Sequence, residues 1–462
     1  MAARFLPTVL LFIAFLVGFG HTALHLPLYR RGGRLSRHEP ADLSHFATLL
    51  AEAEARYALS YREIEGNRLV RRWLPPEGKD ENDPSLIDVA GGQHRWYTEL
   101  RAGDPPQKLE IDIDMLSSDF YTIMTTSGKG SRYDTFASKS HGHSEARVHP
   151  LCRRPNDEFH FPDSNIPVRL DFPICSPSKA SRVTLANSGS FLGLAPHQSL
   201  ARLSSAPLLV QLQKKNTIQD NTWSVTLLDA ESGILSLGAT IAKEVEEAKI
   251  RGEIELKYFG DPVANPQWIT KQVDNQLRIL MLSELPWDHH FKWTKVQGAA
   301  GWWTALMSGV WINGAKVLKN QRVLFDINVP YILAPPVAAQ RFYESIGGTK
   351  RLDPPYDSFF AFPCLNGVNI GLEIGGWIFP SMSGEGTRED ALNGPAGGRF
   401  SLGKLGNGTG YCVGSVVETT MGLRKEWMAS GMKDMWVLGE PFFRGLGVAF
   451  DVDKGRVGVR VY

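Results

Sequence analysis

Alternation of apolar and polar residues recurs along the chain after residue 92. The segments Lys108–Ile113, Trp223–Leu227 and Val457–Val461 each direct every second side chain to one face, which predicts half-buried β-strands. Turn-forming residues separate such segments, since the chain holds 45 glycines and 28 prolines. Helical periodicity after residue 92 is confined to short stretches such as 208–215 and 337–346. This pattern predicts a mostly β protein, built as one large sandwich or as two β lobes.

The residues before 93 follow a different pattern. Apolar side chains recur at helical spacing between Leu43 and Ile64, and Asp42 is placed to cap the first turn of the predicted helix. A basic segment with four arginines precedes this helix, and a polar, proline-rich linker over 75–84 follows it. One amphipathic helix cannot form a core alone. We therefore expect 24–92 to be either an extension that docks on the main domain or a pro-segment that lies over an acidic cleft.

The first 23 residues are typical of a secretory signal. Arg4 precedes an apolar run over 5–20, and small residues follow it. The run is shorter than the roughly 20 residues that span a bilayer. The sequence predicts a signal peptide over 1–23, with an uncleaved membrane anchor as the alternative, and a protein of the secretory pathway that is extracellular or luminal. Asn407 begins a glycosylation sequon, which agrees with this compartment.

Composition and charge exclude several classes of protein. The chain has 50 Lys and Arg against 49 Asp and Glu, a net charge of +1, so nothing indicates a nucleic-acid groove. Apolar residues make up 43% of the 462 residues, too many for a disordered protein. Four cysteines are too few for a disulfide scaffold but allow two bridges.

An internal echo favours two lobes over one sandwich. Asp114 and Asp326 each follow a predicted strand, and they lie almost half the chain apart. Each is followed later by a turn of the form apolar-Leu-Gly, at 191–194 and at 437–440. Two similar lobes that each present one carboxylate at a strand end would bring both carboxylates into a shared cleft.

An ordered set of motifs resembles the pepsin-like aspartic peptidase family over about 93–462. The resemblance implies a two-lobed fold with a central cleft, with lobes over 93–240 and 291–462 and an enlarged connection over 241–290. It also implies that Asp114 and Asp326 occupy the catalytic positions and that Cys364 and Cys412 form a disulfide. The matching segments are Trp96–Leu100 with Gly103–Gln107, Asp114–Tyr121, Glu231–Gly238, Asp326–Pro330, Trp436–Arg444 and Phe450–Asp451.

The departures from the family pattern fall on its chemistry. A carboxylate dyad works when one carboxyl keeps its proton and the other activates water, which needs exact support around the pair. The family threonines that anchor each loop are replaced by Met115 and Ile327, and the family glycines by Leu116 and Asn328. Ser117 is still placed to hydrogen-bond Asp114. Val329 and Pro330 offer no equivalent beside Asp326.

The tyrosine-glycine flap of the family is also missing between Asp114 and Phe191. Without a flap, substrate is not clamped and water is not excluded. We expect the proline-containing stretch around 155–173 to be irregular loop. Cys152 and Cys175 lie where the flap belongs, and we expect them to form a local disulfide rather than a reactive thiol.

These changes favour a binding or accessory protein that keeps the fold and has lost hydrolysis. Its cleft would hold a peptide or hydrophobic ligand, or a partner protein, for example within a biosynthetic assembly. The alternative is an acid endopeptidase with a divergent active site. We expect no cofactor and no metal, because His141–His143 and Asp288–His290 lack the spacing of a closed zinc site. Trp302, Trp303 and Trp311 are expected in the core or the cleft wall.

Overall fold

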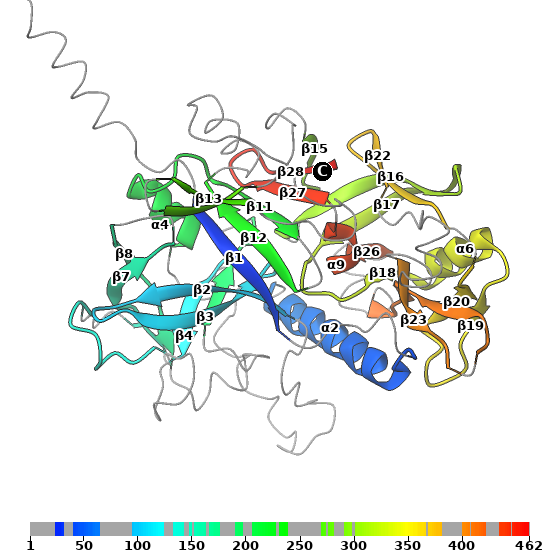
Figure 1. Ribbon diagram of the computed structural model, residues 1–462, viewed down its shortest axis with the longest axis horizontal. Helices are drawn as coiled ribbons and strands as arrows, with labels where there is room; N and C mark the ends of the chain where they lie inside the picture. Colours follow the sequence, from blue (N-terminus) through cyan, green and yellow to red (C-terminus); the bar gives the residue numbers. More distant parts are fainter. Residues whose placement is uncertain are drawn as a thin grey trace, which may run out of the picture.

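A computed structural model shows a mostly β protein with several sheets (Figure 1). All structural statements below concern the residues that it describes. These are 24–31, 40–64, 95–123, 133–142, 147–149, 152–162, 166–175, 190–196, 206–227, 231–238, 269–273, 276–280, 291–297, 301–365, 368–380, 400–406, 408–421, 434–444 and 446–461.

The N-terminal segment forms a strand and a long helix. β1 spans Leu24–Arg31 and α2 spans Leu43–Ile64. The helix begins where the sequence predicts, because the Asp42 carboxylate accepts a hydrogen bond from the backbone N–H of His45 at 3.0 Å. Of the side chains predicted for its apolar face, Phe46, Leu50, Ala53 and Tyr57 lie buried.

The rest of the N-terminal half is a set of strands with one short helix. The strands predicted at 108–113 and 223–227 are present as β3 and β11, and the helix predicted at 208–215 is present as α4. The elements are β2 (Arg95–Ala102), β3 (Gln107–Asp114), β4 (Phe120–Ile123), β5 (Arg147–His149), β6 (Cys152–Arg153), β7 (Asn156–His160), β8 (Val168–Asp171), β9 (Ile174–Cys175), β10 (Ser190–Gly193), α4 (Leu208–Lys214), β11 (Thr222–Leu227) and β12 (Ser232–Leu237).

The C-terminal half is likewise built mainly of strands. The elements from the connection onward are β13 (Ile269–Val273), β14 (Gln276–Leu280), β15 (Lys292–Lys295), β16 (Thr304–Ile312), β17 (Ala315–Phe325), β18 (Ile332–Ala334), α6 (Pro336–Ile346), β19 (Lys350–Arg351), β20 (Phe360–Pro363), β21 (Ile370–Ile374), β22 (Trp377–Pro380), β23 (Ser401–Lys404), β24 (Tyr411–Gly414), β25 (Val416–Glu418), β26 (Met435–Leu438), α9 (Glu440–Phe443), β27 (Leu446–Asp451) and β28 (Arg456–Val461).

The two halves repeat one strand arrangement around their aspartates. β10 runs parallel to β3 and antiparallel to β4, and β4 runs parallel to β9. In the C-terminal half, β26 runs parallel to β17 and antiparallel to β18, and β18 runs parallel to β25. This repetition is compatible with the two-lobed, pepsin-like fold expected from the sequence. The lobe boundaries themselves stay a prediction.

Strands from both halves share the largest sheet. Its order along the main path is β15-β28-β27-β11-β12-β1-β2-β3-β10-β4-β9-β6-β5. β27 of the C-terminal half pairs with β11 of the N-terminal half, and Trp223 stacks on Phe450 across this seam with ring centroids 4.0 Å apart. β1 lies inside the same sheet, between β12 and β2. The N-terminal segment is therefore part of the sheet that joins the halves.

One expectation about secondary structure was wrong. The proline-containing stretch around 155–173 is not irregular loop, because β7 and β8 form an antiparallel hairpin there and β7 also pairs with β2. Prolines 155, 167 and 173 lie outside the strands and Pro162 follows β7, so none removes a ladder hydrogen bond.

The signal peptide predicted over 1–23 and the polar linker predicted over 75–84 lie outside the described residues. Among the described residues, no helix is long and apolar enough to span a membrane.

Candidate functional site

Each aspartate lies at the end of a strand, and its backbone is hydrogen-bonded to the end of the parallel strand beside it. The Asp114 carbonyl accepts a hydrogen bond from Leu194 N–H at 2.7 Å, and Asp326 N–H donates to the Leu438 carbonyl at 3.1 Å. The side chains also match. Asp114 Oδ1 accepts from Leu116 N–H, and Asp326 Oδ1 accepts from Asn328 N–H, two residues on in each case.

Two glycines allow the close packing of these loops. A Cβ on Gly193 would lie 2.4 Å from Asp119 N, and a Cβ on Gly439 would lie 2.1 Å from the Tyr331 carbonyl oxygen. Such approaches leave no room for a side chain. These are the glycines of the two apolar-Leu-Gly turns, so the echo seen in the sequence reflects one packing device used twice.

The two aspartate loops contact each other. The Ile327 N–H donates to Met115 Sδ at 3.4 Å. The side chain of Asn328 reaches the N-terminal half, where Nδ2 donates to the Ile113 carbonyl at 2.6 Å and Oδ1 accepts from Trp96 N–H at 2.8 Å. From the sequence, Met115 and Asn328 were interpreted only as replacements that remove support from the aspartates. Their side chains connect the loops that carry Asp114 and Asp326.

Ser117 does not take the role expected for it. Its hydroxyl donates to Asp119 Oδ2 at 3.4 Å and accepts from Asp119 N–H at 3.2 Å. The predicted hydrogen bond to Asp114 is therefore replaced by a local turn within the loop. The reason is geometric, because the two-residue spacing places the Ser117 hydroxyl over the backbone of Asp119.

Helix α2 covers the aspartates. Arg56 forms an ion pair with Asp326 Oδ2, and the Tyr57 hydroxyl donates to the same oxygen at 2.5 Å. Asp326 is fully buried and Asp114 is half-buried. Burial lowers the pKa of the Arg56 guanidinium, while the charge of Asp114 acts in the opposite direction. An arginine retains its proton under these conditions.

Burial raises the pKa of the Tyr57 phenol well above its ordinary value. The hydroxyl therefore stays protonated and donates a hydrogen bond to Asp326. The Tyr57 ring packs edge-on against Trp302, with centroids 6.4 Å apart. The indole N–H of Trp302 in turn donates to the Leu116 carbonyl at 3.3 Å.

The remaining contacts of α2 are with the C-terminal half. Phe46 packs against Tyr331 and Phe359, and the Tyr331 hydroxyl donates to the Phe46 carbonyl at 2.9 Å. Glu54 accepts a hydrogen bond from the Thr419 hydroxyl at 2.6 Å. In Figure 1 the blue helix runs across the molecule from the ends of β2 and β3 toward β23, and Ala41, just before it, donates to Lys404 of β23. Asp326 is thus covered by a helix that packs into the core, whereas Asp114 is half-buried.

The strand β1 is attached by charge as well as by the sheet. The Arg30 side chain forms a buried ion pair with Glu440 of the C-terminal half at 3.5 Å. Arg31 pairs with Glu110 at 2.9 Å and with Asp112 at 3.3 Å in the N-terminal half. Two arginines of the predicted basic segment, Arg30 and Arg31, therefore connect the N-terminal segment to both halves.

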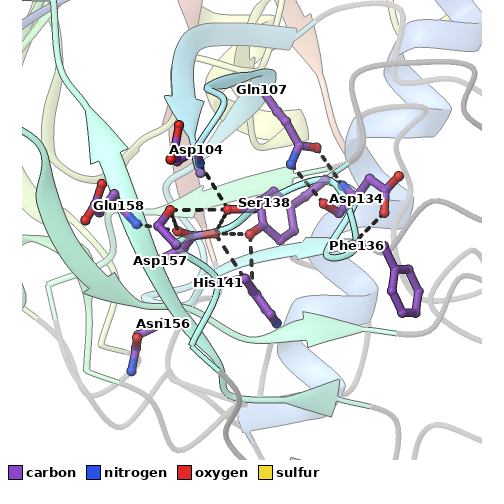
Figure 2. A network of polar contacts seen from close by, with 12 residues as sticks. Asp104, Gln107, Asp134, Phe136, Ser138, His141, Asn156, Asp157 and Glu158 are labelled. Carbon is purple, nitrogen blue, oxygen red and sulfur yellow. Dashed lines mark hydrogen bonds and ion pairs between the residues drawn. The ribbon is translucent and has the colours of Figure 1, made fainter.

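A second polar cluster surrounds Asp157 (Figure 2). Asp157 is fully buried and accepts hydrogen bonds from Tyr133, from the Ser138 hydroxyl at 2.8 Å and from the Ser140 hydroxyl at 2.5 Å. His141 Nδ1 lies 3.8 Å from its carboxylate. The cluster ties the 133–142 loop to β7 and to the turn after β2, where Ser138 also accepts from Asp104 N–H.

The two expected disulfides are present. Cys152 bonds to Cys175 and Cys364 bonds to Cys412, and none of the cysteines is free. The first joins β6 to β9 and the second joins the end of β20 to β24. Each bridge therefore lies within one half.

The other predicted site residues divide as follows. Trp302 and Trp303 are fully buried, as expected for core or cleft wall, and Trp303 donates to the Leu194 carbonyl at 2.6 Å. Asn407, His143 and Asp288–His290 lie outside the described residues. Among the described residues, no group of three or more His, Cys, Asp or Glu is arranged to hold a metal ion.

Two residues that contact Asp326, Arg56 and Tyr57, were not among the site residues predicted from the sequence. Arg56 and Tyr57 stand next to each other on the predicted helix, and Tyr57 was assigned only to its apolar face. A basic residue on a segment expected over an acidic cleft is the signal that the sequence offers, but it does not specify which carboxylate Arg56 meets. Nothing in the sequence marks Met115 and Asn328 as connecting residues.

Comparison with known proteins finds a similarity over part of the chain. No family model matches the chain. An aspartic protease from Phaffia rhodozyma is 24% identical over 162 residues, a match that covers 34% of this chain and 34% of that protein. The chain thus matches about a third of the relative's length. Together with the fold, this similarity indicates an aspartic-peptidase-like protein.

Proposed function

We propose that this protein is an aspartic-peptidase-like protein of the secretory pathway that does not hydrolyse peptides and acts as a binding or accessory subunit. One observation carries the proposal: the buried Asp326 carboxylate is already occupied by Arg56 and Tyr57. The two disulfides agree with an oxidising compartment.

The occupied carboxylate conflicts with the chemistry of a dyad. Hydrolysis needs two neighbouring carboxyl groups that share one proton and activate a water molecule between them. The Arg56 charge favours the ionised form of Asp326, and Tyr57 donates to the same oxygen. A water would have to displace both groups from a site closed by the α2 helix.

The loops add a second argument. The family threonine hydroxyls are absent at Met115 and Ile327, and Ser117 is engaged with Asp119. Loss of one well-placed electrostatic donor commonly costs about 10²–10³ in rate. Even a dyad freed from α2 would lack this support. The residual role that we propose is to bind a peptide-like or hydrophobic ligand, or a partner protein.

A latent acid endopeptidase is the second candidate. The observation in its favour is that Met115 and Asn328 still connect the two loops that carry the aspartates. In this case α2 would be a removable segment, and cutting the 65–94 stretch that follows it would expose the pair.

The test separates the two candidates directly. A recognition sequence for a site-specific protease is introduced into 75–84, and the purified chain is cut there. It is then brought to between about pH 3 and pH 6, an acidic range in which a carboxyl dyad with one raised pKa still shares a proton. The cut chain is then incubated with a broad peptide library, with and without pepstatin. We expect no pepstatin-sensitive cleavage.

The controls are the uncut chain and the double variant Asp114→Ala/Asp326→Ala. Cleavage that appears only after cutting, is blocked by pepstatin and disappears in the double variant would establish the endopeptidase and overturn our proposal.

A further inference from the structure

The two aspartate loops are connected by an amide and a thioether rather than by a pair of hydroxyl groups. Asn328 lies where the sequence resemblance expects glycine, yet its amide makes two hydrogen bonds to backbone of the other half. It bonds to β3 through the Ile113 carbonyl and to β2 through Trp96 N–H. Its own backbone N–H holds Asp326 Oδ1 at 3.1 Å. One residue therefore contacts both the functional carboxylate and the two strands that lead to the other one.

Met115 provides the reciprocal contact. Its thioether sulfur lies at 3.4 Å from Ile327 N–H, so a side chain of the N-terminal loop accepts a hydrogen bond from the C-terminal loop. A thioether is a weak acceptor. Met115 and Asn328 are 1% and 4% exposed, which makes any unsatisfied backbone group there costly. The pair thus forms a two-way connection from which water is excluded.

We propose that Asn328, assisted by Met115, is the positioning residue that fixes the Asp326 loop against the strand carrying Asp114. The inference rests on the proposed function only in taking this cleft as the functional site. The amide carries most of the effect, because it both donates and accepts and its hydrogen bonds have lengths typical of strong ones. The sulfur contributes the weaker contact.

The experiment measures hydrogen exchange of individual backbone amides in the full chain. Asn328→Ala removes the acceptor of Trp96 N–H, and Met115→Leu removes the acceptor of Ile327 N–H while nearly conserving volume. Exchange rates are compared with that of Val448 N–H in β27, which reports overall stability. Loss of one net hydrogen bond corresponds to roughly fivefold faster exchange.

The expected result is specific to each amide. Relative to Val448, Trp96 N–H exchanges at least about fivefold faster in Asn328→Ala, and Ile327 N–H does so in Met115→Leu. The matched control is Asn221→Ala, a buried asparagine at 7% exposure that bonds to Asp453 away from the site. This control should leave both ratios unchanged, since it lowers stability without touching the connection.

Three results would overturn the proposal: both amides following Val448 in the two variants, either amide opening in Asn221→Ala, or Trp96 N–H staying protected in Asn328→Ala. If Asn328→Ala does not fold, the Ile327 amide in Met115→Leu decides alone, and an unchanged ratio there rejects the proposal. No readout involves cleavage, so this inference and the proposed function can fail independently.

Discussion

At the scale of single residues, Arg56 is the group whose removal should matter most. Its charge lies beside the Asp326 carboxylate, and both groups are buried, so each charge compensates the other. Breaking a buried ion pair from one side leaves an uncompensated charge and costs about 3–5 kcal/mol. We expect Arg56→Gln to lower the free energy of unfolding by about this amount at pH 7, as measured by urea denaturation.

The control for Arg56 is Arg351→Gln. Arg351 pairs with Glu418 at 2.6 Å, but its side chain is 39% exposed, so its removal should cost less than about 1 kcal/mol. Adding Asp326→Asn to Arg56→Gln should recover part of the loss, because a neutral amide needs no counter-charge. Equal effects of the two arginine variants would contradict the role of Arg56.

Asp157 leads to a prediction about pH. Burial opposes its ionisation, but hydrogen bonds from Ser140, Tyr133, Glu158 N–H and Ser138 outweigh burial and hold its pKa below the ordinary value of 3.8. A carboxyl with a depressed pKa stabilises the fold above its unfolded pKa and loses this contribution as pH falls through its folded pKa. Asp157→Asn should therefore be destabilised at neutral pH.

The difference between Asp157→Asn and the parent should shrink as the pH falls below about 4, and it is lost once the pH passes below the depressed pKa of the folded carboxyl, where the parent side chain is also neutral. Melting temperatures between pH 2 and pH 7 measure it. The exposed Asp171, changed to Asn, serves as control and should leave the curve unchanged. A constant difference across the whole range would show that the Asp157 charge is not what stabilises the 133–142 loop.

At the scale of elements, the short strands β6 and β9 show how a bridge supports pairing. Each has two residues, and Cys152 lies opposite Cys175 in their antiparallel register. Two-residue strands hold few ladder bonds, so a covalent link contributes a large share of their stability, typically about 2–4 kcal/mol.

We expect non-reducing peptide mapping of the oxidised chain to find Cys152 with Cys175 and Cys364 with Cys412. Replacing either pair by serine should lower the melting temperature without a change in the other bridge. A peptide that links the two halves, or alkylation of thiols before reduction, would refute this pairing.

The helix α2 illustrates an element whose sequence and environment agree. Its apolar side chains follow helical spacing, its first turn is capped by Asp42, and Phe46, Leu50 and Tyr57 are buried against the C-terminal half. The same helix carries Arg56 to Asp326. Its packing and its blocking of the carboxylates therefore cannot be separated by changing one face alone.

At the scale of the whole molecule, the shared sheet couples the two halves. β27 and β28 extend the N-terminal strands, and β1 fills the position between β12 and β2. The largest sheet is therefore built from strands of both halves. We expect a single thermal transition whose calorimetric and van't Hoff enthalpies agree.

The measurement is differential scanning calorimetry of the intact, oxidised chain. A control with Trp223→Leu, which removes a ring stacked on Phe450 at the seam, should lower the transition temperature and keep one peak. Two peaks in the unchanged protein would mean that the halves are independent units.

Much of this protein is determined by its sequence alone. Period-two alternation identifies β3, β11 and β28 as strands, because the pattern is local to each segment. It does not identify their burial, since both faces of β11 are buried where a half-buried strand was expected. Helical spacing with Asp42 specifies α2 for the same local reason. The doubled strand-Asp and Leu-Gly pattern indicates two related halves, since the repeated glycines answer a repeated steric need.

Only the tertiary structure decides which partners the site residues meet. Ser117 and Asp114 are neighbours in sequence, yet the serine bonds to Asp119. Arg56 reaches Asp326 across 270 positions, and Asn328 reaches Ile113 across 215. Side-chain direction and backbone approach at such separations depend on how the halves pack, and no local pattern encodes that. The strands are therefore readable from the chain, whereas the closing of the aspartates by α2 follows from packing.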